Sequence, residues 1–188
     1  MVMPKSPAEP AVLTTFRVCC LNKEILLKVH LDRAPATGTN FCDYVRLGLL
    51  KDATFFRILG PRNQRGQPYP VGVIQGGLPY SPRIGYEPSK GLGPIRHEAT
   101  AMTGLRHRDG TVSMARFAPG QTYGSFCICV GDQPHLDYGG GRFADGQGAA
   151  AFGEVIGGTE VIQTLSNAIE ESEFVSAPIV ITSIERVD

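Results

Sequence analysis

The 188-residue sequence contains no tryptophan, no net charge and no long hydrophobic run. Because 18 basic residues balance 18 acidic ones without a basic run, we expect neither nucleic acid nor a lipid surface as a partner. No stretch approaches the roughly 20 apolar residues that a membrane-spanning helix needs. Residues 1–12 carry three prolines and are too polar for a secretory signal, which predicts a disordered lead-in.

Cysteine is scarce, and no pair has the CxxC spacing of a zinc ribbon or a redox motif. The five cysteines are odd in number, which argues against a disulfide framework and favours free thiols in a reducing compartment. Cys127 and Cys129 alternate with Ile128 on an expected strand, so both should point to the same face. The sequence therefore predicts a soluble cytoplasmic protein.

Motifs for several chemistries are incomplete. His97-Glu98 and His107 lack the HExxH spacing, and the acidic residues between Asp132 and Asp145 lack the alternation of a calcium loop. His107-Arg108-Asp109 has the letters of a kinase catalytic loop without the other kinase motifs, and neither GxSxG nor GK[ST] occurs. We therefore expect no metal ion, no cofactor and no nucleophilic hydrolysis.

Glycine is abundant and concentrated, since 21 of the 23 glycines lie between residues 60 and 158. Such a turn-rich middle favours a β-rich fold over a helical bundle. Alternating or apolar runs predict strands at 14–21, 24–31, 54–59, 72–76, 111–114, 126–130 and 180–187. The first two should be joined by a tight turn at Asn22-Lys23.

Two helices are expected, one beginning at Pro35 and one near Thr159, where the threonine would cap the helix. No linker or repeat divides the chain, so we predict a single domain over residues 13–188. Antiparallel strands closed into a barrel, with the two helices over its open ends, would bury these elements best.

Five motifs, in order, resemble the cyclophilin-type peptidyl-prolyl cis–trans isomerases: APATGTNFCDYV, TFFRIL, VIQGG, GTVSMAR and FGEVIGGTEVI. The stretches TGLRHRDGTVSMAR and CICVGDQPHLDYGG look more like a divergent bacterial branch. The resemblance covers about residues 13–187 and implies a mainly β fold, a closed eight-stranded antiparallel barrel capped by two α-helices. The implied activity is rotation about X-Pro peptide bonds, with no cofactor.

The resemblance also assigns roles to individual residues. Arg57 would be the catalytic cation, and Gln75 would hold its guanidinium and contact the substrate backbone. Ala115 and Arg116 would line the groove, with the Arg116 main chain pairing to the peptide as an added strand. The remaining substrate-binding positions, including the proline pocket and its rim, would be Val73, Leu136, His135, Ser125 and Cys127.

Several of these positions depart from the family pattern. Ser125 stands where the family usually has glutamine, Cys127 replaces the pocket phenylalanine, and Gly72 replaces an aromatic residue. The family histidine falls at Ala149 or in the enlarged loop just before it, and His135 replaces the tryptophan of cyclosporin-sensitive members. These changes predict a shallower proline pocket and weak cyclosporin affinity. Three aromatic residues are candidates to fill the lost volume: Tyr123, Tyr138 and Phe143.

Three functions remain open at this point. The first is an isomerase that acts as a monomer on Pro-containing peptides or unfolded chains and assists folding, supported by Arg57 and Gln75. The second is a cyclophilin-like module that binds Pro-containing segments with little or no catalysis, supported by Ser125, Cys127 and Ala149. The third is a scaffold whose enlarged loops, residues 60–70 and 138–148, contact a partner.

Overall fold

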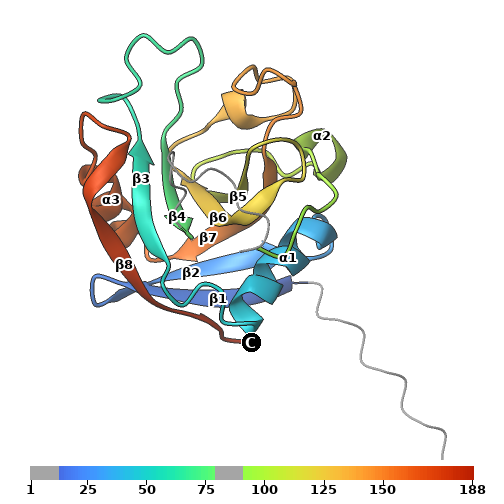
Figure 1. The fold of residues 1–188 in the computed structure, drawn as a ribbon, viewed down its shortest axis with the longest axis vertical. Helices are drawn as coiled ribbons and strands as arrows, with labels where there is room; N and C mark the ends of the chain where they lie inside the picture. Colours follow the sequence, from blue (N-terminus) through green and yellow to red (C-terminus); the bar gives the residue numbers. More distant parts are fainter. Residues whose placement is uncertain (1–12, 79–90) are drawn as a thin grey trace, which may run out of the picture.

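The computed structural model describes residues 13–78 and 91–188, and its strands close on one another (Figure 1). The expected disordered lead-in, residues 1–12, lies outside the described residues. In chain order the elements are β1 (Leu13–Cys20), β2 (Lys23–His30), α1 (Pro35–Arg46), β3 (Thr54–Leu59), β4 (Val73–Gly77), α2 (Thr100–Thr103), β5 (Thr111–Arg116), β6 (Thr122–Cys129), the 3₁₀ turn η2 (Pro134–Leu136), β7 (Ala150–Gly157), α3 (Thr159–Asn167) and β8 (Phe174–Arg186).

The eight strands form a closed antiparallel barrel in the order β1-β2-β7-β5-β6-β4-β3-β8. The barrel predicted above is therefore confirmed. Strand β8 closes it, because this long strand pairs with β1 at one end and with β3 at the other. Within the described residues, no helix is both long enough and apolar enough to cross a membrane.

The β1–β2 turn lies one residue earlier than predicted. Leu21 and Asn22, with φ of 52° and 55°, form it, and Cys20 pairs with Lys23. Positive φ at both central residues is the backbone of the tight hairpin turn that matches the twist of the strands. Strand twist therefore overrides the usual reluctance of leucine to adopt this conformation.

Two strands at the C-terminal side differ from expectation. The residue pattern by itself does not predict β7, which only the eight-stranded resemblance implied, because its Ala150-Ala151-Phe152-Gly153 start is poor in β-formers. Pairing with β2 and β5 holds it extended. β8 begins at Phe174 rather than Val180, although Pro178 interrupts its pattern. In both cases the tertiary pairing overrides local propensity.

Helix α1 packs against β2 and β7 and buries Phe41 and Tyr44. Its Phe41 ring makes aromatic contacts with rings from three strands at 5.2–5.7 Å between centroids, those of Phe16, Phe126 and Phe152. The first turn of α1 is capped from a distant segment, because the buried Glu98 carboxylate accepts the backbone N–H groups of Ala36 at 3.1 Å and Thr37 at 2.8 Å.

Helix α3 packs against β2 and β4 and starts differently from the prediction. Thr159 is its first helical residue and makes no capping hydrogen bond; Gly158, with φ of 80°, occupies the cap position. A side chain at Gly158 would collide with the Glu24 carbonyl, 2.3 Å from the added Cβ, so the close approach of the two segments requires glycine there.

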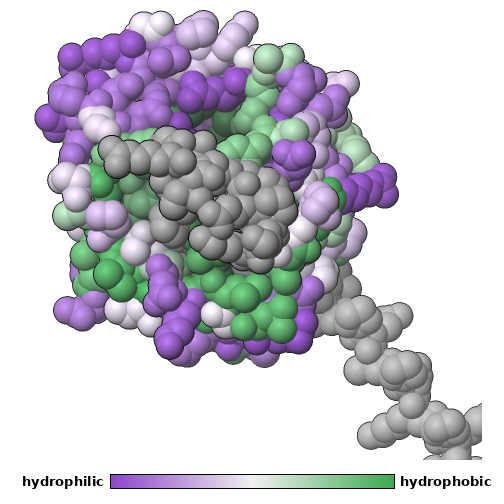
Figure 2. All heavy atoms as spheres, viewed as in Figure 1, coloured by the Kyte–Doolittle hydropathy of each residue, from purple (hydrophilic) through white to green (hydrophobic). Residues whose placement is uncertain are grey.

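Strands β4 and β6 carry apolar side chains on both faces, because successive side chains of a strand point to opposite sides. Ile74 and Ile128 belong to the barrel core. Val73 and Cys129 point outward and join a second cluster with Leu136 of η2. Cys127 packs beside Cys129 on this outer face, as the alternation predicted. The view in Figure 2 shows mostly hydrophilic side chains over the loops at the top of the molecule, those that follow β3 and η2 in Figure 1.

Candidate functional site

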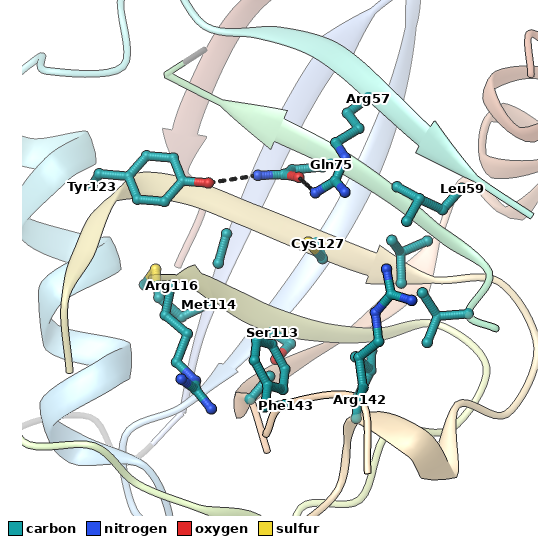
Figure 3. Close-up of a pocket in the computed structure, with 15 residues that line it drawn as sticks. Arg57, Leu59, Gln75, Ser113, Met114, Arg116, Tyr123, Cys127, Arg142 and Phe143 are labelled. Carbon is teal, nitrogen blue, oxygen red and sulfur yellow. Dashed lines mark hydrogen bonds between the residues drawn. The ribbon is translucent and has the colours of Figure 1, made fainter. Parts of the chain in front are cut away.

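A cavity of about 230 Å³ lies on the outer face of the barrel over β3, β4, β6 and β5 (Figure 3). Strand register places four side-chain positions in one row across these strands, because Arg57 pairs with Gln75, Gln75 with Cys127, and Cys127 with Ser113. The lining residues are Arg57, Leu59, Val71, Val73, Gln75, Ser113, Met114, Ala115, Arg116, Tyr123, Cys127, Leu136, Arg142, Phe143 and Ala149.

The upper wall in Figure 3 is polar and is organised by Gln75. Its side-chain oxygen accepts from Arg57 Nη1 at 3.2 Å, and its nitrogen donates to the Tyr123 hydroxyl at 2.8 Å and to Ser125 Oγ at 3.0 Å. Gln75 thus holds the Arg57 guanidinium, as expected. Both amide hydrogens are taken up within the protein, so a hydrogen bond donated by Gln75 to the substrate backbone would require one of these bonds to break. Among the described residues, the side-chain oxygen accepts only from Arg57 and keeps a lone pair for a backbone N–H of the substrate, the contact expected above.

The Arg57 guanidinium is held from a second side by Glu173, directly before β8. Nε donates at 3.1 Å and Nη2 at 2.5 Å to the same carboxylate oxygen, Oε2. The other oxygen accepts from Gln64 Nε2 at 2.7 Å. The two paired side chains are 29 % and 30 % exposed, so the ion pair is partly buried at the edge of the cavity. No local sequence pattern points to Glu173, which is 116 positions from Arg57.

Two predicted positions do not line the cavity. Ser125 is fully buried behind Gln75, where its hydroxyl donates to the Gly76 carbonyl at 3.0 Å. His135 turns toward the loop after β3, with its ring 5.5 Å from that of Tyr69. Family position predicted the groove for Ser125 and the rim of the proline pocket for His135. Burial behind Gln75 removes Ser125 from the cavity surface, and the contact with Tyr69 draws His135 toward the loop after β3.

The other wall is apolar. Val73, Cys127 and Leu136 line it as expected, together with Leu59, Val71 and Ala149. Phe143, from the enlarged loop before β7, packs against this cluster and supplies an aromatic surface. Tyr123 also lines the cavity, whereas Tyr138 is 53 % exposed and is not among the lining residues. Two of the three candidate aromatic residues therefore reach the site.

Ala115 and Arg116 line the cavity at the end of β5. The Arg116 guanidinium forms two hydrogen bonds of 2.8 Å with Asp145, and its Cζ lies 3.9 Å from the centre of the Phe143 ring. Its Nε also donates to the Gly148 carbonyl at 2.8 Å. The Arg116 side chain therefore fastens the loop before β7 against the cavity.

Ser113, His107 and Asp137 are arranged like an acyl-transfer triad below the cavity. His107 Nε2 lies 2.8 Å from Ser113 Oγ, and His107 Nδ1 lies 2.8 Å from Asp137 Oδ1. However, Ser113 is 1 % exposed and the His107 side chain is fully buried, so a substrate carbonyl cannot approach the hydroxyl. The network instead braces η2, and with it Leu136, against β5.

The ionisation states suit electrostatic rather than nucleophilic chemistry. Burial raises the pKa of both Tyr123 and Cys127 to about 12, so the phenol and the thiol stay neutral near pH 7. Among the residues that the structure describes, no three His, Cys, Asp or Glu side chains are grouped to hold a metal ion. What the cavity offers is a fixed guanidinium beside an apolar surface.

Comparison with known proteins agrees with this geometry. Residues 15–186 match the family described as cyclophilin type peptidyl-prolyl cis-trans isomerase/CLD. Peptidyl-prolyl cis-trans isomerase B of Escherichia coli is 32% identical over 143 residues, 76% of this chain and 77% of that protein. Peptidyl-prolyl cis-trans isomerase A of Dickeya dadantii is 32% identical over 97% of this chain and 90% of its own. A cyclophilin-type isomerase from Cryptosporidium parvum shares the fold with a TM-score of 0.73 at 22% identity, covering 94% of this chain and 98% of its own.

Proposed function

The chain belongs to the cyclophilin-type peptidyl-prolyl cis-trans isomerase family, and on this premise we propose that the cavity beside Arg57 is where it turns X-Pro bonds. The proline ring occupies the apolar wall formed by Val73, Leu136 and Phe143. The prolyl nitrogen then faces the Arg57 guanidinium. The observation that carries this assignment is one cavity lined by a fixed cation on one side and apolar side chains on the other.

The chemistry requires no covalent intermediate. The X-Pro bond resists rotation because the nitrogen lone pair is delocalised into the carbonyl, with a barrier of about 18–20 kcal/mol. A hydrogen-bond donor aimed at the nitrogen stabilises the pyramidal nitrogen of the twisted state, in which the lone pair is localised. Since Gln75 and Glu173 already hold the guanidinium, little reorganisation accompanies the reaction.

One observation favours the second candidate, a module that binds Pro-containing segments with little catalysis. Glu173 neutralises much of the charge on Arg57, and two of the three nitrogen atoms of the guanidinium donate to it. This arrangement weakens the field at the prolyl nitrogen. However, the pair is partly exposed rather than enclosed, and Nη1 is directed to Gln75 on the cavity wall. We therefore keep isomerisation as the main function.

The deciding experiment measures cis-trans exchange of a short Ala-Ala-Pro-Phe peptide by NMR exchange spectroscopy. We expect exchange far above the uncatalysed rate and a loss of about 100-fold in kcat/KM for Arg57→Ala. The matched control is Arg62→Ala, because Arg62 also pairs with a glutamate, Glu171, but lies exposed and outside the cavity. Peptide binding without exchange above background would overturn catalysis in favour of the binding module. Full activity of Arg57→Ala would overturn the role of Arg57.

The substrates we propose are Pro-containing peptides and unfolded chains, with the protein acting as a monomer in the cytoplasm. Cyclophilins bind Pro-containing peptides, and the Cryptosporidium relative has a structure in the presence of the dipeptide Ala-Pro. All five cysteines are free thiols, which is compatible with a reducing compartment.

A further inference from the structure

Three arginine side chains line the cavity, and they differ in how their charge is balanced. Arg57 is paired with Glu173 and Arg116 with Asp145. Arg142 lies within 4.0 Å of no carboxylate among the residues that the structure describes. Figure 3 shows its side chain rising from the loop before β7, so that the guanidinium points into the cavity across from Arg57. The cavity therefore has one cation that no acidic side chain of the described chain neutralises.

The position of Arg142 is fixed by its surroundings. Its backbone N–H donates to the His135 carbonyl at 3.1 Å, and its Nη1 donates to the Tyr69 carbonyl at 3.1 Å. The neighbouring Gly141, with φ of 90°, lies against the Tyr69 ring so closely that an added Cβ would be 2.6 Å from a ring carbon. The two enlarged loops thus contact each other, and their contact holds the Arg142 side chain over the cavity before any ligand arrives.

The charge on Arg142 is incompletely solvated, because the side chain is partly buried. Burial and the nearby Arg57 both lower the pKa of Arg142, while Glu173 acts in the opposite direction. Glu173 is not a full partner, since its ion pair is with Arg57 and it lies beyond 4.0 Å from the Arg142 guanidinium. An anion brought by a ligand would compensate this charge at small entropic cost, because the guanidinium is already positioned.

We propose that Arg142 is a specificity-determining residue that binds the carboxylate of an Asp or Glu directly before or directly after the target proline. This inference rests on the proposed function, because it places the proline ring on the apolar wall beside Arg142. The substrate class is then acidic Pro-containing segments. A substrate that carries lysine instead of Asp or Glu at that position would face the unpaired positive charge of Arg142 and would be disfavoured.

The test uses two sets of peptides. In the first, Glu, Gln or Lys directly precedes the proline: Ala-Glu-Pro-Phe, Ala-Gln-Pro-Phe and Ala-Lys-Pro-Phe. In the second, the same three residues directly follow the proline. We expect kcat/KM for the Glu peptide to exceed that for the Gln peptide by about 5–10-fold in at least one set. In Arg142→Gln this ratio should fall to about one, and Arg142→Lys should retain part of it. The ratio should also shrink between 0.05 and 0.5 M NaCl.

Arg65→Gln is the matched control, because Arg65 lies exposed on the facing loop and does not line the cavity; it should keep the wild-type ratio. A wild-type ratio of one in both sets, or an unchanged ratio in Arg142→Gln, would overturn the role of Arg142. Dissociation constants for the same peptides, from NMR titration, give the ratio without any turnover. Absent exchange would therefore contradict the proposed catalysis, while the Kd ratio would still decide on Arg142.

Discussion

Arg57 donates two hydrogen bonds to a single carboxylate oxygen of Glu173, at 3.1 and 2.5 Å, and a third bond from Nη1 to Gln75 at 3.2 Å. The first two bonds fix the plane of the guanidinium. The third directs Nη1 toward Gln75 on the cavity wall. The same carboxylate therefore both orients the proposed catalytic cation and reduces its charge.

Glu173→Gln is expected to lower the free energy of unfolding by about 1 kcal/mol at pH 7. Burial opposes ionisation of Glu173, but the hydrogen bonds and charge of Arg57 outweigh it and hold the pKa below its ordinary value of 4.5. Because the folded pKa is lowered, the stabilisation is complete above pH 4.5 and is lost as the pH falls through the folded pKa. Urea unfolding of both proteins at several pH values measures the difference.

The difference between wild type and Glu173→Gln should therefore shrink below pH 4.5. Glu171→Gln serves as the control, because Glu171 pairs with the exposed Arg62 and should change stability little at any pH. A Glu173→Gln difference that stays constant from pH 7 to pH 3 would show that the carboxylate charge is not what stabilises the fold there.

Phe143→Ala is expected to lower kcat/KM for a Pro peptide by about tenfold, since the ring supplies part of the apolar wall against which the proline would pack. Most of the loss should appear in KM, because the ring contacts ground state and transition state alike. Tyr138→Ala removes an exposed aromatic ring from the same loop and should leave both constants near their wild-type values. Equal effects of the two substitutions would mean that the loop, rather than the ring, matters.

The thiol of Cys127 should be poorly reactive although it lines the cavity. Its pKa of about 12 leaves only about one thiolate in 10⁴ at pH 8. We expect alkylation by iodoacetamide, followed residue by residue with mass spectrometry, to be more than 100-fold slower in the native protein than in urea. Rapid native labelling of Cys127 would show that the thiol is ionised by a neighbouring charge instead.

Glu98→Gln is expected to destabilise the protein by about 1–2 kcal/mol, because the carboxylate accepts two backbone N–H groups at the start of α1 and the Thr37 hydroxyl. The amide can accept at only one atom. Thermal or urea unfolding gives the difference, with the exposed Glu185→Gln as control. A change no larger than that of the control would show that α1 does not depend on this cap.

The strand pattern along the chain predicted an antiparallel barrel, and the family resemblance supplied the number of strands and the site residues. Alternation over 126–130 encodes which side chains point outward, and that property depends only on neighbours in sequence. In β3 the alternation is interrupted between Phe55 and Arg57, so the outward position of Arg57 depends on its pairing with Gln75. The family motifs then identified Arg57 and Gln75, which do lie side by side on adjacent strands. The residue pattern did not predict β7, because pairing with β2 and β5, rather than the propensity of its own residues, holds this strand extended.

Two features of the tertiary structure, the closure of the barrel and the contact between the enlarged loops, position side chains that no local sequence pattern predicts. Glu173 reaches Arg57 across 116 positions because β8 pairs with β3, and Glu98 reaches the start of α1 across more than 60. Phe143 enters the cavity because Arg116 and Asp145 fasten its loop, and Arg142 points inward because Tyr69 holds it. Ion pairs and loop contacts depend on distances in space and not on neighbours in sequence. The sequence therefore determined most of the strands and the motif residues of the site, and the tertiary structure decided which distant residues join them.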